Sequence, residues 1–330
     1  RPATGGECSA RLRASRVSPC PGAVWDVTGR SHPMTSASEP RSVPVAPASP
    51  VPFERVLRPR GAWWRLDWRR LLQHRDLLYL LVRRDFVARY QQTILGPAWF
   101  ILQPLIATGA FTLVFSRGLG TSTDGIAPSF LFYQCGLLVW GYFSVVLGTA
   151  GNTFQANATV FTKVYFPRLI VPLAVAIGSL APFGVQLLVF VLCYVPFAVG
   201  AEGWRPDFLM LALLPCWLLQ AAAFALGMSL LTSALSAKYR DLQHALPFLI
   251  QLGLFVTPVV YPLSQLGAGG RWLALLNPLT PVVEAFRRAF FGTGTLTPGL
   301  VAGSLAATVA ALAVGIYAFQ RAERTFADTV

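Results

Sequence analysis

The sequence predicts an all-α integral membrane protein with six transmembrane helices. Three observations carry this prediction. Of the 330 residues, 54% are hydrophobic and only 12% are charged, against about 25% charged in a typical soluble domain. The mean hydropathy is +0.54. Six apolar stretches reach the roughly 20 residues that a transmembrane helix needs. This composition excludes a coiled coil, a collagen-like chain and a small disulfide scaffold.

The N-terminal region carries most of the net charge of +13. Residues 1–95 contain 16 arginines against 7 acids, which indicates a cytoplasmic flank near anionic lipids rather than nucleic-acid binding. Residues 1–50 are rich in Pro, Ser, Ala and Arg and contain no apolar run of signal-peptide length, so we expect a disordered extension. Met34 is an alternative start, under which residues 1–33 are not native.

Residues 51–95 predict a cytoplasmic amphipathic segment at the membrane interface. On a helix here, charged side chains such as Arg83 and Arg84 fall on one side, and apolar side chains such as Leu81 and Phe86 on the other. The alternative is a soluble helix that packs on a partner.

Residues 96–330 form the predicted transmembrane domain. Its six spans lie near residues 96–115, 128–154, 169–201, 208–237, 242–267 and 300–320. Loops on one side carry 16 Lys and Arg residues and those on the other side carry 5, so we expect both termini in the cytoplasm. The 25 arginines against 2 lysines, with abundant Ala, Gly and Pro, indicate the coding bias of a G+C-rich bacterial genome.

Residues 268–299 predict two short re-entrant helices before the last span. Asn277-Pro278 and Pro281 cut this stretch into apolar pieces that are too short to cross a membrane. Glu284 and Arg288 are four residues apart, so we expect them to pair on one helical face. The alternative is an amphipathic surface helix.

Several catalytic motifs are absent from the sequence. Neither Lys163 nor Lys238 lies in the Gly-Lys-Ser/Thr of a P-loop, and no HExxH motif occurs. Ser229 lacks the following glycine of a membrane serine protease, and we interpret it as a helix-packing residue. The first four predicted spans contain no Asp or Glu, which disfavours proton-driven transport. We therefore expect no catalytic residue, no metal and no cofactor in this chain. We interpret the five cysteines as ordinary buried side chains.

Four segments carry a family resemblance. They are RRDFVARYQQTILGPAW at 83–99, NATVFTKVYFPRLIVP at 157–172, KYRD at 238–241 with TPVVYP at 257–262, and NPL at 277–279 with EAFR at 284–287. In this order and spacing they resemble the membrane subunit of bacterial type-2 ABC exporters of polysaccharides, the family that exports O-antigen, capsule and teichoic acid. The resemblance covers roughly residues 70–325 and leaves out the extension before residue 51.

The resemblance implies a permease that exports a lipid-linked polysaccharide across the bacterial cytoplasmic (inner) membrane. It implies a homodimer of six-span subunits bound to two copies of a separate ABC ATPase subunit, which binds the ATP and Mg. It also implies that the loop at 157–168 docks in the ATPase as a coupling helix, whereas an ordinary positive-inside loop is the alternative. The residues expected in this coupling are Asn157, Phe161, Lys163, Tyr165, Phe166, Pro167 and Arg168.

The resemblance makes residues 268–299 a gate at the outer mouth, with Asn277, Glu284, Arg287 and Arg288 as its polar residues. It places a second group at the interface helix and the cytoplasmic entrance: Arg83, Arg84, Arg89, Tyr90, Tyr239, Arg240 and Asp241. Arg240 and Asp241 would brace this loop, and the ring of Tyr239 would meet a sugar. A helix cap is the alternative for Asp241.

Sugars present CH faces that stack on aromatic rings, so a polysaccharide channel needs inward-facing aromatic residues. The candidates are Tyr133, Trp140, Tyr142, Phe143, Trp217 and Phe255. Packing or lipid contact is the alternative for each.

Three other functions remain open from the sequence. A type-2 ABC exporter of a drug or another lipid would share the same architecture. A multispan glycosyltransferase would need acidic residues gathered at one membrane face, whereas the loop acids Asp124, Glu202, Asp207 and Asp241 are scattered. A purely structural membrane scaffold is the third.

Overall fold

The structure is a computed structural model that describes residues 73–90, 96–157, 161, 166–200, 206–267 and 276–329. The chain divides into two units, Arg1–Arg58 and Pro59–Val330, and all described residues belong to the second. All regular structure in these residues is helical, which confirms the all-α class. The predicted extension at 1–50 and most of the predicted interface segment lie outside the described residues.

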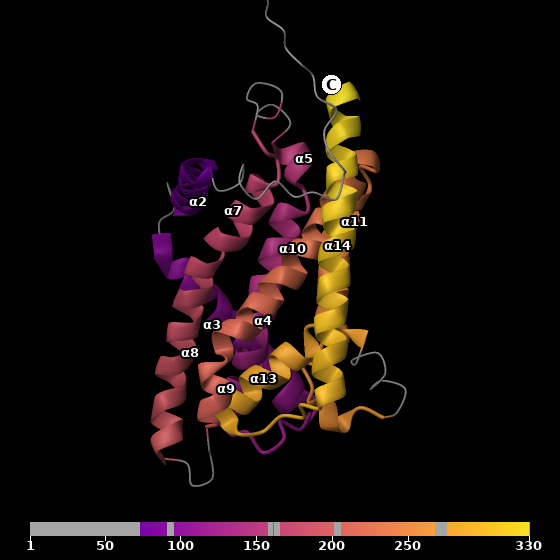
Figure 1. The fold of residues 1–330 in the computed structure, drawn as a ribbon. Helices are drawn as coiled ribbons and strands as arrows, with labels where there is room; N and C mark the ends of the chain where they lie inside the picture. Colours follow the sequence, from indigo (N-terminus) through magenta and orange to yellow (C-terminus); the bar gives the residue numbers. More distant parts are fainter. Residues whose placement is uncertain are drawn as a thin grey trace, which may run out of the picture. The chain divides into compact units, whose positions relative to one another are not determined.

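The elements follow one another along the chain as a bundle of helices (Figure 1). They are α2 (Arg75–Tyr90), η1 (Gly96–Ala98), α3 (Trp99–Phe111), η2 (Thr112–Gly118), α4 (Ser129–Ala150), α5 (Thr153–Ala156), α7 (Ile170–Gly178), α8 (Leu180–Gly200), α9 (Phe208–Ala212), α10 (Leu214–Lys238), α11 (Leu242–Val256), η3 (Leu263–Gln265), α13 (Thr280–Phe291) and α14 (Pro298–Thr329).

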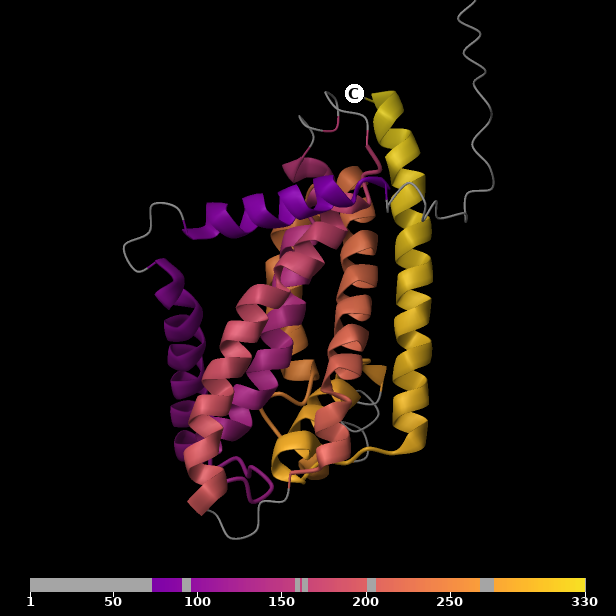
Figure 2. The same cartoon turned by 60° about the vertical axis from the view of Figure 1, so that its left-hand side comes forward.

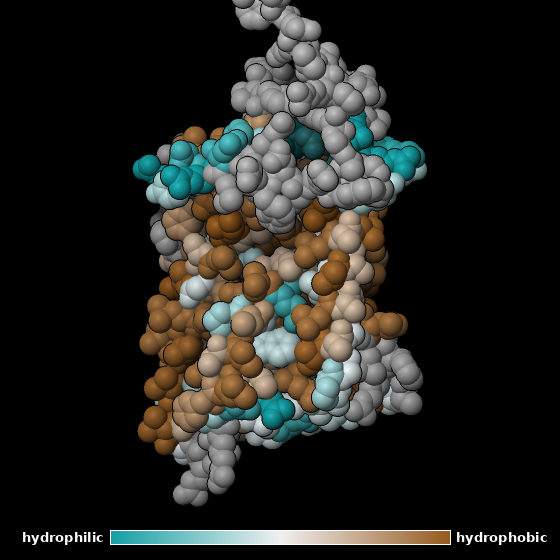
Figure 3. All heavy atoms as spheres, in the orientation of Figure 1, coloured by the Kyte–Doolittle hydropathy of each residue, from teal (hydrophilic) through white to brown (hydrophobic). Residues whose placement is uncertain are grey.

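The bundle has two distinct ends. The helices α2 and α5 and the C-terminal part of α14 lie at one end, which we call the α2 end. The helices α9 and α13 lie at the opposite end, which we call the α13 end (Figures 1 and 2). Between the two ends the visible surface is mostly hydrophobic, with a few hydrophilic side chains near its middle, and hydrophilic side chains lie above and below it (Figure 3).

Five helical segments of the described chain are long and apolar enough to cross a membrane. They are Trp99–Gly118, Ser129–Ala150, Ile170–Gly200, Leu214–Lys238 and Pro298–Arg324. Each coincides with a predicted span to within a few residues. The prediction of six spans is not confirmed, because the fifth predicted stretch contains only the shorter helix α11 and the three-residue η3.

The helix α11 has 15 residues and therefore spans about 22 Å, less than the roughly 30 Å of a bilayer core. It ends where Thr257 turns to extended backbone, with ψ of 137°. Pro258 follows directly, and a proline disfavours helical backbone in the residue before it. The hydropathy of 242–267 predicted one span, and this proline ends its helix early.

The third span is broken at Ser179, between α7 and α8. Pro182 accounts for the break, since a proline ring clashes with the carbonyl four residues before it, here that of Gly178. The fourth span is broken near the α13 end, where α9 ends at Ala212 and α10 begins at Leu214 with Pro215 in its first turn.

The helix α4 forms the centre of the largest hydrophobic core. It packs against α3, α7, α8, α10, α11 and α13. Contact with α11 is close, because a Cβ atom on Gly253 would lie 2.8 Å from the Trp140 ring. Most of α4 is buried within this single chain.

The helix α2 runs across the ends of the spans at the α2 end (Figure 2). It packs on α7 and buries Leu81, while Arg83 and Arg84 are exposed. Phe86, which we predicted on the apolar side, is 42% exposed and stacks loosely on Phe100. The position of α2 in a membrane interface stays a prediction.

The helices α10 and α14 cross in close contact through glycines. A Cβ atom on Gly227 would lie 2.7 Å from the carbonyl carbon of Ala311, and one on Gly315 would meet the carbonyl oxygen of Gly227. Ser229, predicted as a packing residue, is fully buried next to this crossing. Small residues at such crossings let two backbones approach closely within a membrane.

We predict that Gly315→Ala lowers the thermal stability of the detergent-solubilised protein, because the added methyl group forces the two backbones apart at a cost of about 1–3 kcal/mol. The matched control is Gly303→Ala on the same helix, where a Cβ atom would meet nothing within 4 Å. This control should leave the melting temperature equal or slightly raised, since alanine is the better helix former. Equal melting temperatures for both variants would contradict the close crossing.

Candidate functional site

The α13 end contains a polar centre built around α13. Asn277 lies just before this helix and makes two side-chain hydrogen bonds. Its Oδ1 accepts a hydrogen bond from the Leu279 N–H at 3.0 Å, and its Nδ2 donates one to Thr257 Oγ1 at 2.6 Å. Gly292 ends the helix with a φ of +72°, a left-handed conformation that glycine adopts without strain. Asn277 thus joins α13 to the segment that follows α11.

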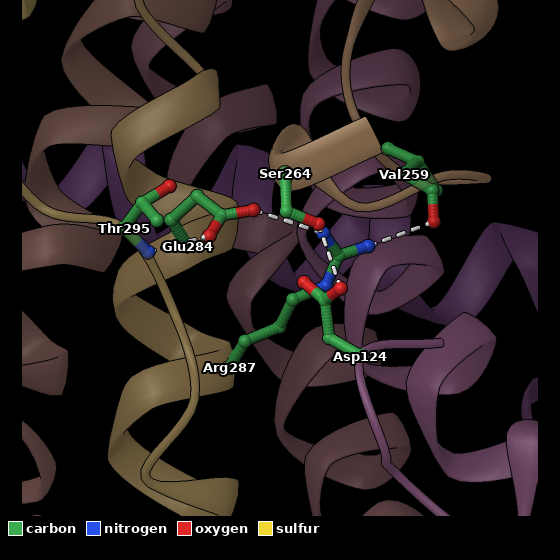
Figure 4. Close-up of polar contacts among 6 residues, drawn as sticks. All are labelled: Asp124, Val259, Ser264, Glu284, Arg287 and Thr295. Atoms are coloured by element: carbon green, nitrogen blue, oxygen red, sulfur yellow. Dashed lines mark hydrogen bonds and ion pairs between the residues drawn. The ribbon is translucent and has the colours of Figure 1, made fainter. Parts of the chain in front are cut away.

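Two opposite charges lie inside this centre. Glu284 and Arg287 are 3% and 2% exposed, and Arg287 Nη1 donates to Glu284 Oε1 at 3.0 Å (Figure 4). Each charge has further partners. Arg287 Nη2 donates to the Val259 carbonyl at 2.9 Å, and Glu284 Oε2 accepts from the Thr295 N–H at 3.0 Å. The guanidinium also lies over the Phe132 ring, with its Cζ 3.9 Å from the ring centroid.

The pair therefore fixes four parts of the chain at one point. They are α13 itself, α4 through Phe132, the segment after α11 through Val259, and the chain after α13 through Thr295. A charge that is buried this deeply would strongly destabilise the fold if it had no partner. Glu284 and Arg287 therefore each require the other to be present. Only Arg287 Nε among the buried atoms of this pair has no hydrogen-bond partner.

Arg288 does not pair with Glu284, so that prediction was wrong. Arg288 Nε instead lies 3.3 Å from Asp207 Oδ2, in a contact that is partly exposed. Asp207 Oδ1 also accepts from the backbone N–H groups of Leu209 and Met210 and so caps α9. Arg288 therefore pairs with the Asp207 carboxylate. Arg287 occupies the buried position beside Glu284.

The alternative of an amphipathic surface helix is also wrong, because every residue of α13 except Arg288 is buried. A second tie at this end joins the chain between η2 and α4 to η3, where Ser264 Oγ donates to Asp124 Oδ1 at 2.7 Å (Figure 4). The other short helix that we predicted would fall on residues 268–275, which lie outside the described residues.

The described residues of the predicted coupling loop are buried or half-buried. Lys163 and Tyr165 lie outside the described residues. Asn157 is half-buried and donates from Nδ2 to the Thr153 carbonyl, and Pro167 and Arg168 are half-buried. Phe161 and Phe166 are buried and lie against each other, and Phe161 also lies against the Phe154 ring of α5. The coupling role of the loop stays a prediction.

The predicted cytoplasmic entrance is an exposed turn between α10 and α11. Tyr239, Arg240 and Asp241 are all exposed, and Lys238 Nζ lies 5.1 Å from the centroid of the Tyr239 ring. Arg240 and Asp241 form no ion pair in the described structure, and the Asp241 side chain makes no capping hydrogen bond. The side chains of Arg89 and Tyr90 lie outside the described residues.

Five of the six candidate channel aromatics are buried in the core around α4: Tyr133, Trp140, Tyr142, Phe143 and Trp217. Tyr142, for example, donates its hydroxyl to the Ala176 carbonyl at 3.0 Å. Within a single chain these rings pack against neighbouring side chains, which agrees with the alternative interpretation that they are packing residues. Phe255 is 46% exposed, and it shares the exposed surface of α11 with Phe248, which we did not predict.

Comparison with known proteins gives one family. The sequence profile of the ABC-2 type transporter family matches residues 76–291. The O-antigen export system permease protein RfbA of Myxococcus xanthus is 31% identical over 225 residues, which are 68% of this chain and 83% of that protein. The polysialic acid transport protein KpsM of Escherichia coli is 26% identical over 248 residues, 74% of this chain and 92% of that protein.

A third relative is the capsule polysaccharide export inner-membrane protein CtrC of Neisseria meningitidis serogroup B. It is 24% identical over 237 residues, which are 70% of this chain and 84% of that protein. The matched family region includes α13 and its buried ion pair.

We predict unequal effects for the two neighbouring arginines of α13. Arg287→Met leaves Glu284 buried without its cation and should cost about 3–5 kcal/mol of stability. Arg288→Met removes only the partly exposed contact with Asp207 and should cost less than about 1 kcal/mol. The measurement is the melting temperature of each detergent-solubilised variant. Similar losses for both variants would refute the special role of the buried pair.

Proposed function

The chain belongs to the ABC-2 type transporter family, and from this premise we propose that it is the permease subunit of a bacterial polysaccharide exporter. The carrying observation is that relatives named for O-antigen, polysialic acid and capsule export align with two thirds or more of this chain and with most of their own length. We propose that the substrate is a lipid-linked polysaccharide and that the membrane is the cytoplasmic, or inner, membrane.

The energy for transport would come from a separate ATPase subunit that holds the ATP and Mg. This proposal is supported by the sequence, in which neither lysine lies in a P-loop. The loop between α5 and α7 would dock on that subunit as a coupling helix. Its described residues Phe161 and Phe166 belong to one hydrophobic cluster with Leu81 of α2.

We propose a homodimer that binds two ATPase copies. Two helices support the pairing, because α3 is exposed over most of its length and α11 exposes Phe248, Leu252 and Phe255. Both helices pack on the buried α4, and a second copy would cover their exposed faces. The α11 helix would complete a sixth span together with the segment 257–267.

The orientation follows from the basic residues of the described chain. Those at the α2 end are Arg75, Arg83, Arg84, Arg168, Lys238, Arg240, Arg321 and Arg324, and those at the α13 end are Arg117, Arg287 and Arg288. Cytoplasmic loops carry the excess of Lys and Arg, so the α2 end and both termini would be cytoplasmic.

The α13 end would then face outward, and α13 would be one of two re-entrant gate helices at the outer mouth. Its buried ion pair supports this role. A gate must hold one defined position in each state, and a buried pair with fixed partners tolerates only well-formed arrangements.

The function is tested by deleting the gene in its native host. We expect the surface to lose one polysaccharide while that polymer accumulates inside the cell, because synthesis continues without export. Gel analysis of surface and intracellular glycan measures both, and a plasmid copy carrying Gly303→Ala, an open position of α14, should restore export. Loss of the polymer without intracellular accumulation would instead favour a glycosyltransferase, and an unchanged glycan would favour a drug or lipid exporter.

The orientation is tested with single cysteines in a variant whose five native cysteines are replaced by serine. We expect Arg240→Cys to react with a membrane-impermeant maleimide only after the inner membrane is opened. Ser122→Cys, in the chain before α4, should react from outside in spheroplasts. The opposite pattern would reverse the proposed topology.

A further inference from the structure

A second hydrophobic cluster lies at the α2 end, apart from the core around α4. Its centre is a group of four buried rings, Phe154, Phe161, Phe166 and Phe319, which we call the aromatic cluster. Phe154 of α5 stacks on Phe319 of α14 with ring centroids 4.6 Å apart. Phe161 lies 6.1 Å from Phe154 and 5.7 Å from Phe166, again between centroids.

The aromatic cluster joins the α5–α7 loop to the last helix. Phe161 and Phe166 belong to the loop, whereas Phe319 lies near the C-terminal end of α14. Arg168 adds a polar tie at the same place. Its Cζ lies 5.3 Å from the Phe161 centroid, and its Nη1 donates to the Glu323 carbonyl of α14 at 3.1 Å. The loop is therefore held to α14 directly by Arg168 and, through Phe154 of α5, by the ring that stacks on Phe319.

Three more helices contribute to the same cluster through Leu81 of α2, Ile170 of α7 and Leu230 of α10. Protein interiors are close-packed and change between discrete arrangements rather than deforming smoothly. A displacement of the loop must therefore move α14 with it or break the aromatic packing.

The other end of α14 is tied to the start of α13. Ser304 Oγ donates to the Pro278 carbonyl at 2.6 Å, and Gln220 Nε2 of α10 donates to Ser304 Oγ. Between Ser304 and Glu323 the helix contains no proline, and 19 residues of α-helix extend about 28 Å. Like α4 and α10, α14 is uninterrupted here, whereas α3 and α11 contain prolines and the third span is broken at Ser179.

We propose that α14 transmits movement from the α5–α7 loop to the segment that carries α13, and that Phe319 is the positioning residue that couples the two. The inference rests on the proposed function, because it takes the loop as the place where an ATPase subunit pushes. The route runs from the loop through Phe319 and Glu323, along α14, to Ser304 and Pro278.

The test uses the full complex of this chain with its ATPase, reconstituted with the lipid-linked polymer. Phe319→Ala should leave assembly and ATP hydrolysis in place, while export per ATP hydrolysed falls about fivefold or more. The matched control is Tyr317→Ala, two residues away on the exposed side of α14. Phe319→Leu, which keeps most of the volume, should restore part of the coupling and remains usable where the alanine variant fails to assemble.

A second readout reports on the far end of the route. Thr295 is exposed beside Glu284, so a maleimide can label Thr295→Cys in a cysteine-free variant. In the otherwise unchanged chain, ATP with vanadate should alter the labelling rate. Phe319→Ala should abolish that response, and Tyr317→Ala should retain it.

The outcomes separate the two proposals. An unaltered response and unaltered export per ATP in both Phe319 variants would overturn the route along α14 while leaving the exporter intact. The route along α14 would also be overturned if the chain without a Phe319 substitution exports the polymer but shows no labelling response at Thr295→Cys. A chain that binds no ATPase and supports no export would overturn the proposed function itself.

Discussion

The buried ion pair between Glu284 and Arg287 is the interaction on which the α13 end of this protein depends. Moving a charge out of water is costly, and only a close partner with further hydrogen bonds offsets that cost. The partners here come from three other parts of the chain: the Val259 carbonyl, the Thr295 N–H and the Phe132 ring. The two charges can be buried only when α4, the segment after α11 and the chain after α13 meet at this point. A short helix that could not anchor itself is thereby held inside the fold.

The α2 end is organised differently, by rings rather than by charges. Its aromatic cluster is separate from the core around α4, yet Leu226 of α10 packs against both. The helices α10 and α14 cross at Gly227 and Gly315 between these two regions. This pair of closely packed helices is therefore the structural connection between a loop that would receive force and a polar centre that would respond. Prolines interrupt α3 and α11, and the third span is broken after α7, whereas α4 is uninterrupted like α10 and α14.

Hydropathy predicted the five segments that are long enough to cross a membrane. A transmembrane helix must be apolar along its whole length, regardless of which helices it packs against. Hydropathy overestimated the helix at 242–267 because a window average does not register that Pro258 ends it. From spacing alone we paired Glu284 with Arg288, although residues at i+3 and i+4 both lie on the same helical face. In the structure Arg288 binds Asp207, which is 81 residues away in the sequence, and Arg287 pairs with Glu284 instead. The burial of five of the six channel candidates in the single chain could not be predicted for the same reason. Residue type shows that Tyr142 suits a sugar, but only the fold shows that its hydroxyl binds the Ala176 carbonyl.

The central claim is that this chain passes a polysaccharide across a membrane when a partner hydrolyses ATP. The most direct measurement reconstitutes the chain and its ATPase in vesicles with a fluorescent lipid-linked polymer, oriented so that the α13 end faces the lumen. We expect the polymer to become protected from an added glycosidase only when both subunits and ATP are present. Protection without ATP, or no protection with the complete complex, would contradict the account.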